Sequence, residues 1–231
     1  MKIAKIASAF AGLVLGASAF QANALPFEVD ITVDNSYALY YGTETTATNF
    51  VGSNGDWTNT ESYTFDLPKD HFIYVVTQSD LAVAQGFLAQ FTNLSNNSRF
   101  YSQDSQWQVT ATGHYGFAPY DNTPTSFAEL NAQLALANAG TNPSAGWVGT
   151  TAGNANGASP WGTRPEIDAA ARWVWYSSNG DLNPTEPGFD HDEYLIFRIA
   201  VNSSTEVPEP ANLALLGLGL LGLGFARKRK V

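Results

Sequence analysis

Apolar, weakly charged stretches lie at the two ends of this 231-residue chain and frame a more polar middle. Stretches of this kind suit a membrane better than the core of a small domain. The middle of the chain, residues 25–206, therefore has to supply the fold. Its roughly 180 residues are enough to bury the core of a single domain.

Residues 1–24 have the three parts of a secretory signal peptide. Two early lysines give the positive start, residues 6–15 form a short apolar run, and Ala22 and Ala24 form a small-x-small cleavage site. A second such site lies at residues 17–19. The apolar run is short for a bilayer-spanning helix of about 20 residues. We therefore expect export through the Sec translocon and cleavage by signal peptidase after Ala24, rather than an uncleaved membrane anchor.

The C-terminal segment, residues 207–231, also has three parts. It begins with a stiff, extended strip, because proline fixes its own φ and pushes the preceding residue towards extended backbone. This strip consists of Val207, Pro208, Glu209 and Pro210. An uncharged run follows at residues 213–226, and as a helix it would span about 21 Å, less than the roughly 30 Å core of a bilayer.

A basic cluster follows this run and consists of Arg227, Lys228, Arg229 and Lys230. Basic residues beside an apolar helix stay on the cytoplasmic side of a membrane. With the signal peptide translocated first, we expect the body outside, a transmembrane helix at residues 213–226 transiently in the inner membrane, and the basic tail in the cytoplasm. These physical features alone leave an ordinary tail anchor as an alternative.

The order of a Pro-Glu-Pro strip, a leucine- and glycine-rich helix and a basic terminus resembles the PEP-CTERM sorting signal of exopolysaccharide-producing Gram-negative bacteria. The resemblance covers the last 25 residues and includes the valine before the first proline. It implies that an exosortase, a membrane-embedded cysteine protease or transpeptidase, recognises Pro208, Glu209 and Pro210. That enzyme would remove the helix and pass the body to the cell surface or the extracellular matrix, so the chain would be its substrate.

The body is strongly acidic, with five basic and 20 acidic residues between positions 25 and 207 and hence a net charge near −15. A charge of this sign repels phosphate backbones and anionic lipids, so we expect no nucleic-acid partner and consider cations and neutral polymers instead. The chain contains no cysteine. This excludes a cysteine nucleophile, Cys-ligated zinc, an iron–sulfur cluster and attached c-type haem.

Strand patterns predict a mainly β body. The first strand is marked by apolar residues that alternate with polar ones, namely Phe27, Val29, Ile31 and Val33. Further segments rich in β-branched and aromatic residues are 63–67, 72–77, 107–112, 172–176 and 194–201. We therefore expect one antiparallel β-sandwich. Residues 81–91 fit both a helix face and a strand, so the sequence leaves this segment open.

One helix and one long loop are also predicted. Ser126 and Glu129 have the spacing of a capping box, and Gly140 is placed to end the helix. We expect this helix to cover one end of the sandwich. Residues 140–163 are dominated by Gly, Asn, Ala, Ser and Thr, a composition typical of a surface loop.

Short, mostly aromatic elements recur along the body, at residues 63–65, 74–77, 84–86, Trp107, Trp147, Trp161, 171–175 and 197–198. Their order resembles that of bacterial surface proteins with a galactose-binding-like jelly roll. The resemblance implies a jelly-roll-like sandwich with one or two short helices, and binding of carbohydrate or matrix.

Four acidic residues lie within thirteen positions, namely Asp181, Asp190, Asp192 and Glu193. Closely spaced carboxylates on turns are the ligands that a hard cation such as calcium requires. Their spacing is not that of an EF-hand loop. The cluster predicts a Ca²⁺ site before the last strand, and surplus exposed acid in an acidic body is the alternative.

Tryptophans are candidates for carbohydrate binding because a flat aromatic ring can stack against a sugar. Trp147 and Trp161 lie in the predicted loop and are the candidate platform. Trp173 and Trp175 are two residues apart, hence on one face of a strand, where packing in the core is the competing role.

No catalytic motif is evident. The three histidines are dispersed, and neither the H-E-x-x-H nor the G-x-S-x-G pattern occurs. The two carboxylates of a glycosidase need only meet in space, about 5 to 9.5 Å apart, so the sequence cannot show such a pair. We predict a non-catalytic surface or biofilm-matrix protein that exosortase sorts and that binds exopolysaccharide. A secreted carbohydrate-active enzyme and a purely structural matrix component are the alternatives.

Overall fold

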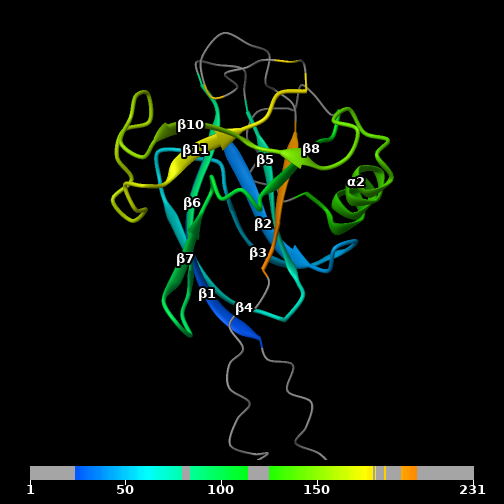
Figure 1. Cartoon of the computed structure of the whole chain (residues 1–231), viewed down its shortest axis with the longest axis horizontal. Coiled ribbons are helices and arrows are strands. Elements are labelled where there is room, and N and C mark those ends of the chain that lie inside the picture. The colour runs from blue at the N-terminus through cyan, green and yellow to red at the C-terminus, as the bar shows by residue number, and fades with distance from the viewer. Residues whose placement is uncertain are drawn as a thin grey trace, which may run out of the picture. The chain divides into compact units, whose positions relative to one another are not determined.

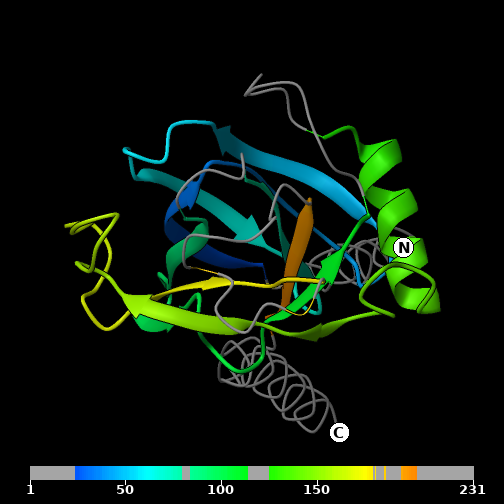
Figure 2. The same ribbon diagram turned by 90° about the horizontal axis from the view of Figure 1, so that it is seen from above.

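The computed structural model describes residues 24–79, 84–113, 125–178, 180, 185 and 194–201. This part of the chain is mainly β and forms two antiparallel sheets with one short helix, in line with the predicted fold class (Figures 1 and 2). The predicted signal peptide up to residue 23, the Pro-Glu-Pro strip, the transmembrane helix and the basic tail lie outside the described residues. No helix in the described part of the chain is long and apolar enough to cross a membrane.

Each sheet contains six strands. Sheet A has the spatial order β10 (Thr151–Ala155), β11 (Arg172–Trp175), β6 (Gly86–Asn93), β1 (Leu25–Asp34) and β4 (Glu61–Leu67), and β7 (Ser98–Tyr101) also pairs with β6. Sheet B has the spatial order β3 (Ala47–Asn54), β2 (Ser36–Gly42), β5 (Phe72–Gln78), β12 (Leu195–Ala200), β8 (Gln108–Ala111) and β9 (Val148–Gly149). The helix α2 (Phe127–Ala139) lies to one side of the strands in Figure 2.

The two sheets share one hydrophobic core. The alternating residues of β1, which are Phe27, Val29, Ile31 and Val33, are at most 2% exposed and all face this core, so the first predicted strand is confirmed. Aromatic contacts join the sheets: the ring of Phe87 in sheet A lies 5.2 Å from that of Phe197 in sheet B. The body is therefore a sandwich whose stability comes mainly from the apolar surface buried between its sheets.

The ambiguous segment is a strand where it is described, because β6 covers Gly86–Asn93 and all eight residues are buried. Both faces of β6 are covered, so its apolar residues show no clean period of two. Gly86 leaves room for a tryptophan, since a Cβ atom there would lie 2.7 Å from the Trp173 ring. The close approach of this ring to the β6 backbone requires glycine.

The helix prediction is confirmed in its position and corrected in its role. The Ser126 hydroxyl accepts a hydrogen bond of 3.2 Å from the Glu129 amide, and Gly140 ends α2 in the left-handed conformation at φ 67°. Leu130 and Leu134 are fully buried. They pack on the outward side chains of sheet B, which are Ala38, Tyr40, Tyr74, Val76 and Ile196. The helix therefore covers the outer face of sheet B and not an end of the sandwich, because this face is itself apolar.

The predicted surface loop at residues 140–163 contains two strands. β9 extends sheet B beyond β8, and β10 forms an edge of sheet A beyond β11. The Gly- and Asn-rich composition is tolerated because both strands are short and lie at sheet edges, where fewer side chains have to pack. Hydrogen bonding to existing strands thus outweighed the weak local strand preference.

Both ends of the described body lie at the same end of the sandwich. Leu25, the first residue of β1, pairs with Leu67 at the end of β4. Val201, just after β12, donates its amide hydrogen to the His71 carbonyl at 3.2 Å. Because residues 68–71 connect β4 to β5, the two chain ends flank one turn (Figure 1).

Candidate functional site

The predicted calcium ligands, Asp181, Asp190, Asp192 and Glu193, lie outside the described residues. Within the residues that are described, no three His, Asp or Glu side chains come together as a candidate metal site. The calcium site therefore stays a prediction from sequence.

Trp161 is inside the protein and not on a surface platform. It is 4% exposed, and its ring stacks on that of Trp173 with centroids 4.1 Å apart. Its indole nitrogen donates a hydrogen bond of 2.8 Å to the Asp34 carboxylate. A sugar ring has no access to this indole face, so the expectation of an exposed Trp161 is corrected.

Trp147 is half-buried on the other side of the sandwich, against the outer face of sheet B. The guanidinium carbon of Arg198 lies 3.8 Å from the centroid of the Trp147 ring, which is a cation–π contact. The indole nitrogen donates to the Asn138 side chain at 2.7 Å. One face of Trp147 is thus occupied, and Trp147 and Trp161 do not form one site, because the two rings belong to opposite outer faces.

Trp173 and Trp175 are both core residues, at most 1% exposed, but they do not share a face of β11. Trp173 packs in the cluster outside sheet A, whereas Trp175 packs between the sheets, 5.9 Å from the ring of Phe197. Val174 and Trp175 are neighbours in sequence and both pack between the sheets, so the alternation is broken at the end of β11.

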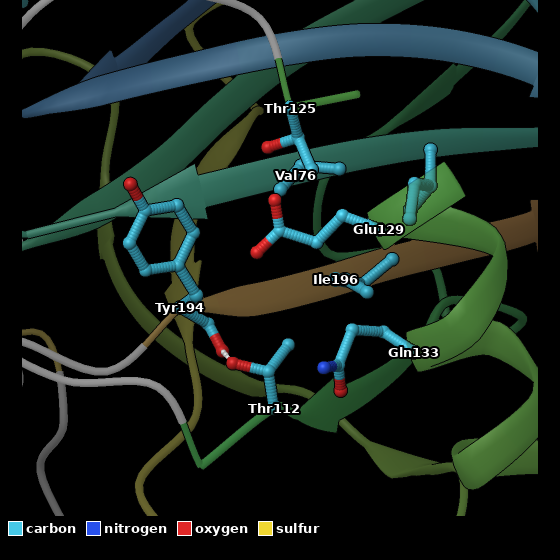
Figure 3. A pocket seen from close by; sticks show the side chains of 8 residues that line it. Val76, Thr112, Thr125, Glu129, Gln133, Tyr194 and Ile196 are labelled. Atoms are coloured by element: carbon cyan, nitrogen blue, oxygen red, sulfur yellow. Dashed lines mark hydrogen bonds between the residues drawn. The ribbon is translucent and has the colours of Figure 1, made fainter. Parts of the chain in front are cut away.

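A groove lies between α2 and sheet B (Figure 3). It contains about 250 Å³ of free space, part of it open to solvent. The enclosed part of the groove is only about the size of one water molecule, so a ligand would lie across its open side. The residues that line it are Val76, Thr112, Thr125, Glu129, Leu130, Gln133, Tyr194 and Ile196.

The groove has an apolar floor and a polar rim. Val76 and Ile196 come from neighbouring strands of sheet B, and Leu130 comes from the buried side of α2. Figure 3 shows the Glu129 side chain extending from α2 so that its carboxylate lies beside the ring of Tyr194, whereas the buried Gln133 side chain lies nearer Thr112. An aromatic ring thus lies next to a carboxylate.

Hydrogen bonds hold the two sides of the groove in place. The Thr112 hydroxyl donates to the Tyr194 carbonyl at 2.9 Å, which fixes the backbone next to the ring. The Tyr40 hydroxyl donates to the carbonyl of Thr125, just before α2. Burial, reinforced by the nearby Glu129 carboxylate, raises the pKa of Tyr40 to about 12, so this phenol stays a neutral donor at physiological pH.

The sequence did not single out this groove. Glu129 and Gln133 are four residues apart, so they lie on the same side of α2. The predicted helix was therefore enough to place these two residues together. Tyr194 reaches them only because β12 pairs with β8 and β5, contacts that join distant parts of the chain. Local spacing carries no signal for such a contact.

The C-terminal segment of the chain matches a known family model. Residues 206–230 match the PEP-CTERM protein-sorting motif. The chain carries an exosortase sorting signal. The PEP-CTERM motif implies export, an exosortase as processing partner, and membrane-associated sorting towards the cell surface. No curated protein and no solved structure matches the chain.

The motif and the described body occupy separate parts of the chain. The last strand of the core ends at Ala200, and the motif begins at residue 206. No described strand or helix overlaps the motif. Cleavage within the PEP-CTERM motif would therefore leave every described element of the sandwich in place.

Proposed function

We propose that this protein is a non-catalytic component of the cell surface or extracellular matrix of a Gram-negative bacterium, and that its body binds a neutral polysaccharide through the groove between α2 and sheet B. The PEP-CTERM motif supports delivery to the surface. The ligand class rests on the groove, and the single observation that carries it is the ring of Tyr194 beside the Glu129 carboxylate.

The chemistry of the groove fits one sugar unit of a longer chain. The aliphatic face of a pyranose can pack on Tyr194, while its hydroxyls can donate to the Glu129 carboxylate and exchange hydrogen bonds with the Gln133 amide. A polysaccharide offers many equivalent units, so even a shallow groove that binds one unit weakly has many places to bind on each polymer.

The charge of the body favours a neutral polymer over an acidic one. The body has a net charge near −15, and Glu129 adds a carboxylate at the groove itself. An anionic polysaccharide would be repelled by the net charge of the body at a distance and by Glu129 in the groove. Both repulsions are strongest at low ionic strength. Dextran, amylose and cellulose are suitable neutral probes.

The positions of β1 and β12 are compatible with cleavage by signal peptidase at one end of the body and by exosortase at the other, with the fold left intact. β1 begins at Leu25, directly after the predicted signal-peptidase site, and Leu25 is itself buried. β12 ends before the sorting motif. We infer that signal peptidase and exosortase both cut outside the described strands and helix.

The proposal is tested with the processed protein recovered from its host, incubated with insoluble cellulose, dextran resin, amylose resin and polysaccharide extracted from the host matrix. We expect retention on at least one neutral polymer without any change in its chain length. Glu129→Gln and Tyr194→Ala should each weaken retention about tenfold, as expected for a lost hydrogen bond to a charged group or a lost stacking face. Glu28→Gln, a carboxylate change on strand β1 of sheet A, is the matched control and should bind normally.

The alternatives give different results in the same assay. A secreted carbohydrate-active enzyme would release soluble sugar ends from one of the polymers. A purely structural matrix component would show neither retention nor cleavage. Retention that the two groove variants do not alter would contradict the groove as the binding site.

A further inference from the structure

We propose that one end of the sandwich, here called the attachment end, docks against the external face of the exosortase while the sorting motif is cleaved. The attachment end consists of Leu25, the β4–β5 turn at residues 68–71, the β6–β7 turn at residues 94–97, and Val201. This inference rests on the sorting function of the PEP-CTERM motif and names a surface of the body that takes part in it.

Backbone hydrogen bonds and strand register bring the parts of the attachment end together. Leu25 pairs with Leu67, and the Val201 amide donates to the His71 carbonyl at 3.2 Å, so both chain ends lie against the β4–β5 turn. The Leu94 amide donates to the Pro26 carbonyl at 2.8 Å, which holds the β6–β7 turn beside the start of β1.

The length of chain before the motif limits which surface can face the enzyme. Seven peptide links separate Val201 from Pro208, so an extended chain reaches at most about 25 Å. A compact body of about 180 residues has a diameter of roughly 40 Å. The tether is shorter than the body, so an enzyme that holds Pro208, Glu209 and Pro210 in its cleft is within reach of the attachment end and not of the far end.

The surface chemistry of the attachment end fits a protein partner. Leu94 is 41% exposed there, so its apolar side chain is available for a contact. Lys69, in the adjacent turn, is exposed and is one of only five basic residues in the acidic body. Asp70 is exposed beside Lys69, so the attachment end presents an apolar side chain with charges of both signs near it, as the rim of a protein–protein interface does.

This arrangement also separates the two activities of the body. Val76 in the groove lies four residues along β5 from Phe72, about 13 Å further from the attachment end. Thr112 and Tyr194, also in the groove, adjoin the ends of β8 and β12 that are remote from Val201. Docking of the attachment end therefore leaves the groove free during processing.

The test compares tether variants of the full-length chain in the native host, with processing followed by intact mass and by the fraction retained in the inner membrane. Deletion of residues 202–205 should reduce processing at least tenfold, because the body then collides with the enzyme before the motif reaches the cleft. Replacement of the same four residues by Gly-Ser-Gly-Ser keeps the length and should process normally. Normal processing of the deletion variant would overturn the proposal.

A surface substitution tests the contact itself. Leu94→Asp should slow processing severalfold at the natural tether length, and a ten-residue Gly/Ser insertion after Thr205 should remove that effect by freeing the body from the enzyme. Phe127→Asp is the control, because Phe127 is 40% exposed at the start of α2, outside the attachment end. Equal effects of Leu94→Asp and Phe127→Asp, or no effect of either, would overturn the contact.

One further variant separates this inference from the sorting function on which it rests. The triple change Pro208→Ala, Glu209→Ala and Pro210→Ala should abolish processing at every tether length. Normal processing of the triple variant would overturn both the motif's role and the docking. An unprocessed triple variant together with a tolerated deletion of residues 202–205 would overturn the docking alone.

Discussion

The two sheets are covered on their outer faces in different ways. On sheet A, loop segments are held by side-chain hydrogen bonds, among them the bond of 2.8 Å from Trp161 to Asp34. On sheet B, α2 packs through Leu130 and Leu134, and its N-terminal half leaves the groove beside it. The loops on sheet A follow the surface of the sheet and cover it closely, because their polar side chains bond to it. The helix on sheet B is straight and rigid, so it leaves a groove along its side.

Each layer also buries one arginine, but in a different manner. On sheet A, the guanidinium of Arg164 donates to the Thr58 carbonyl at 2.7 Å and the Trp161 carbonyl at 3.0 Å, which joins two loop segments. On sheet B, Arg198 lies between the rings of Trp147 and Phe72, 3.8 and 5.2 Å from their centroids. Burial lowers the pKa of both guanidinium groups. Arg164 therefore organises backbone, while Arg198 fills space between aromatic rings.

The largest expected effect comes from removing the centre of the sheet A layer. Trp173→Ala should lower the free energy of unfolding by about 3 to 5 kcal/mol, because the ring is fully buried and stacks on Trp161. Urea unfolding followed by far-UV circular dichroism measures the change. Trp147→Ala, on the half-buried ring of the sheet B layer, should cost clearly less. Equal losses of unfolding free energy in the two variants would show that the outer layers of sheet A and sheet B stabilise the protein alike.

A smaller effect is expected from the hydrogen bond that closes the sheet A layer. Asp34→Leu leaves the buried Trp161 indole nitrogen without this acceptor and should cost about 1 to 3 kcal/mol. Asp34→Asn keeps an acceptor oxygen and should cost less, which makes it the matched control. Chemical denaturation of both variants gives the difference, and identical stabilities would mean that the acceptor is dispensable.

Local patterns were enough to predict the parts of the fold that rest on neighbouring residues. The alternation in β1 and the cap residues of α2 are of this kind, and both are confirmed. The β2 strand was missed because Ser36–Gly42 is buried on both faces and does not alternate. Trp161 looked like a loop residue because its acceptor, Asp34, lies 127 positions away.

The groove illustrates the same limit. Its floor depends on the register of β12 against β5, which pairs Ile196 with Val76. That register is set by packing across the whole sandwich and by no short motif. The sorting signal is the opposite case, because a linear segment that acts by itself can be read from sequence, and the match at residues 206–230 bears this out.

Strongly alkaline pH should open the sheet B layer before the sheet A layer. Burial raises the pKa of Tyr40 to about 12 and that of Tyr74 still further, and both rings lie on the outer face of sheet B. A tyrosine with a raised pKa stabilises the fold fully below its unfolded value of about 10, and this contribution is lost as pH rises through the folded pKa. Hydrogen exchange at increasing pH should therefore show α2 losing protection before β10 and β11. Simultaneous loss would contradict the order, and Tyr40→Phe should delay the opening of α2.

The smallest stability effect with a functional consequence is expected at the N-terminus of α2. Ser126→Ala removes the hydroxyl that accepts from the Glu129 amide and should cost about 1 kcal/mol, whereas Ser126→Asp keeps a capping oxygen and should be nearly neutral. The same turn carries Glu129 into the groove, so fraying of this turn misplaces the carboxylate without unfolding the sandwich. Retention on neutral polysaccharide should then fall in Ser126→Ala more than the small loss of stability explains. If retention instead follows stability alone, the helix acts only as a cover for sheet B, and the difference between the two outer layers has no bearing on binding.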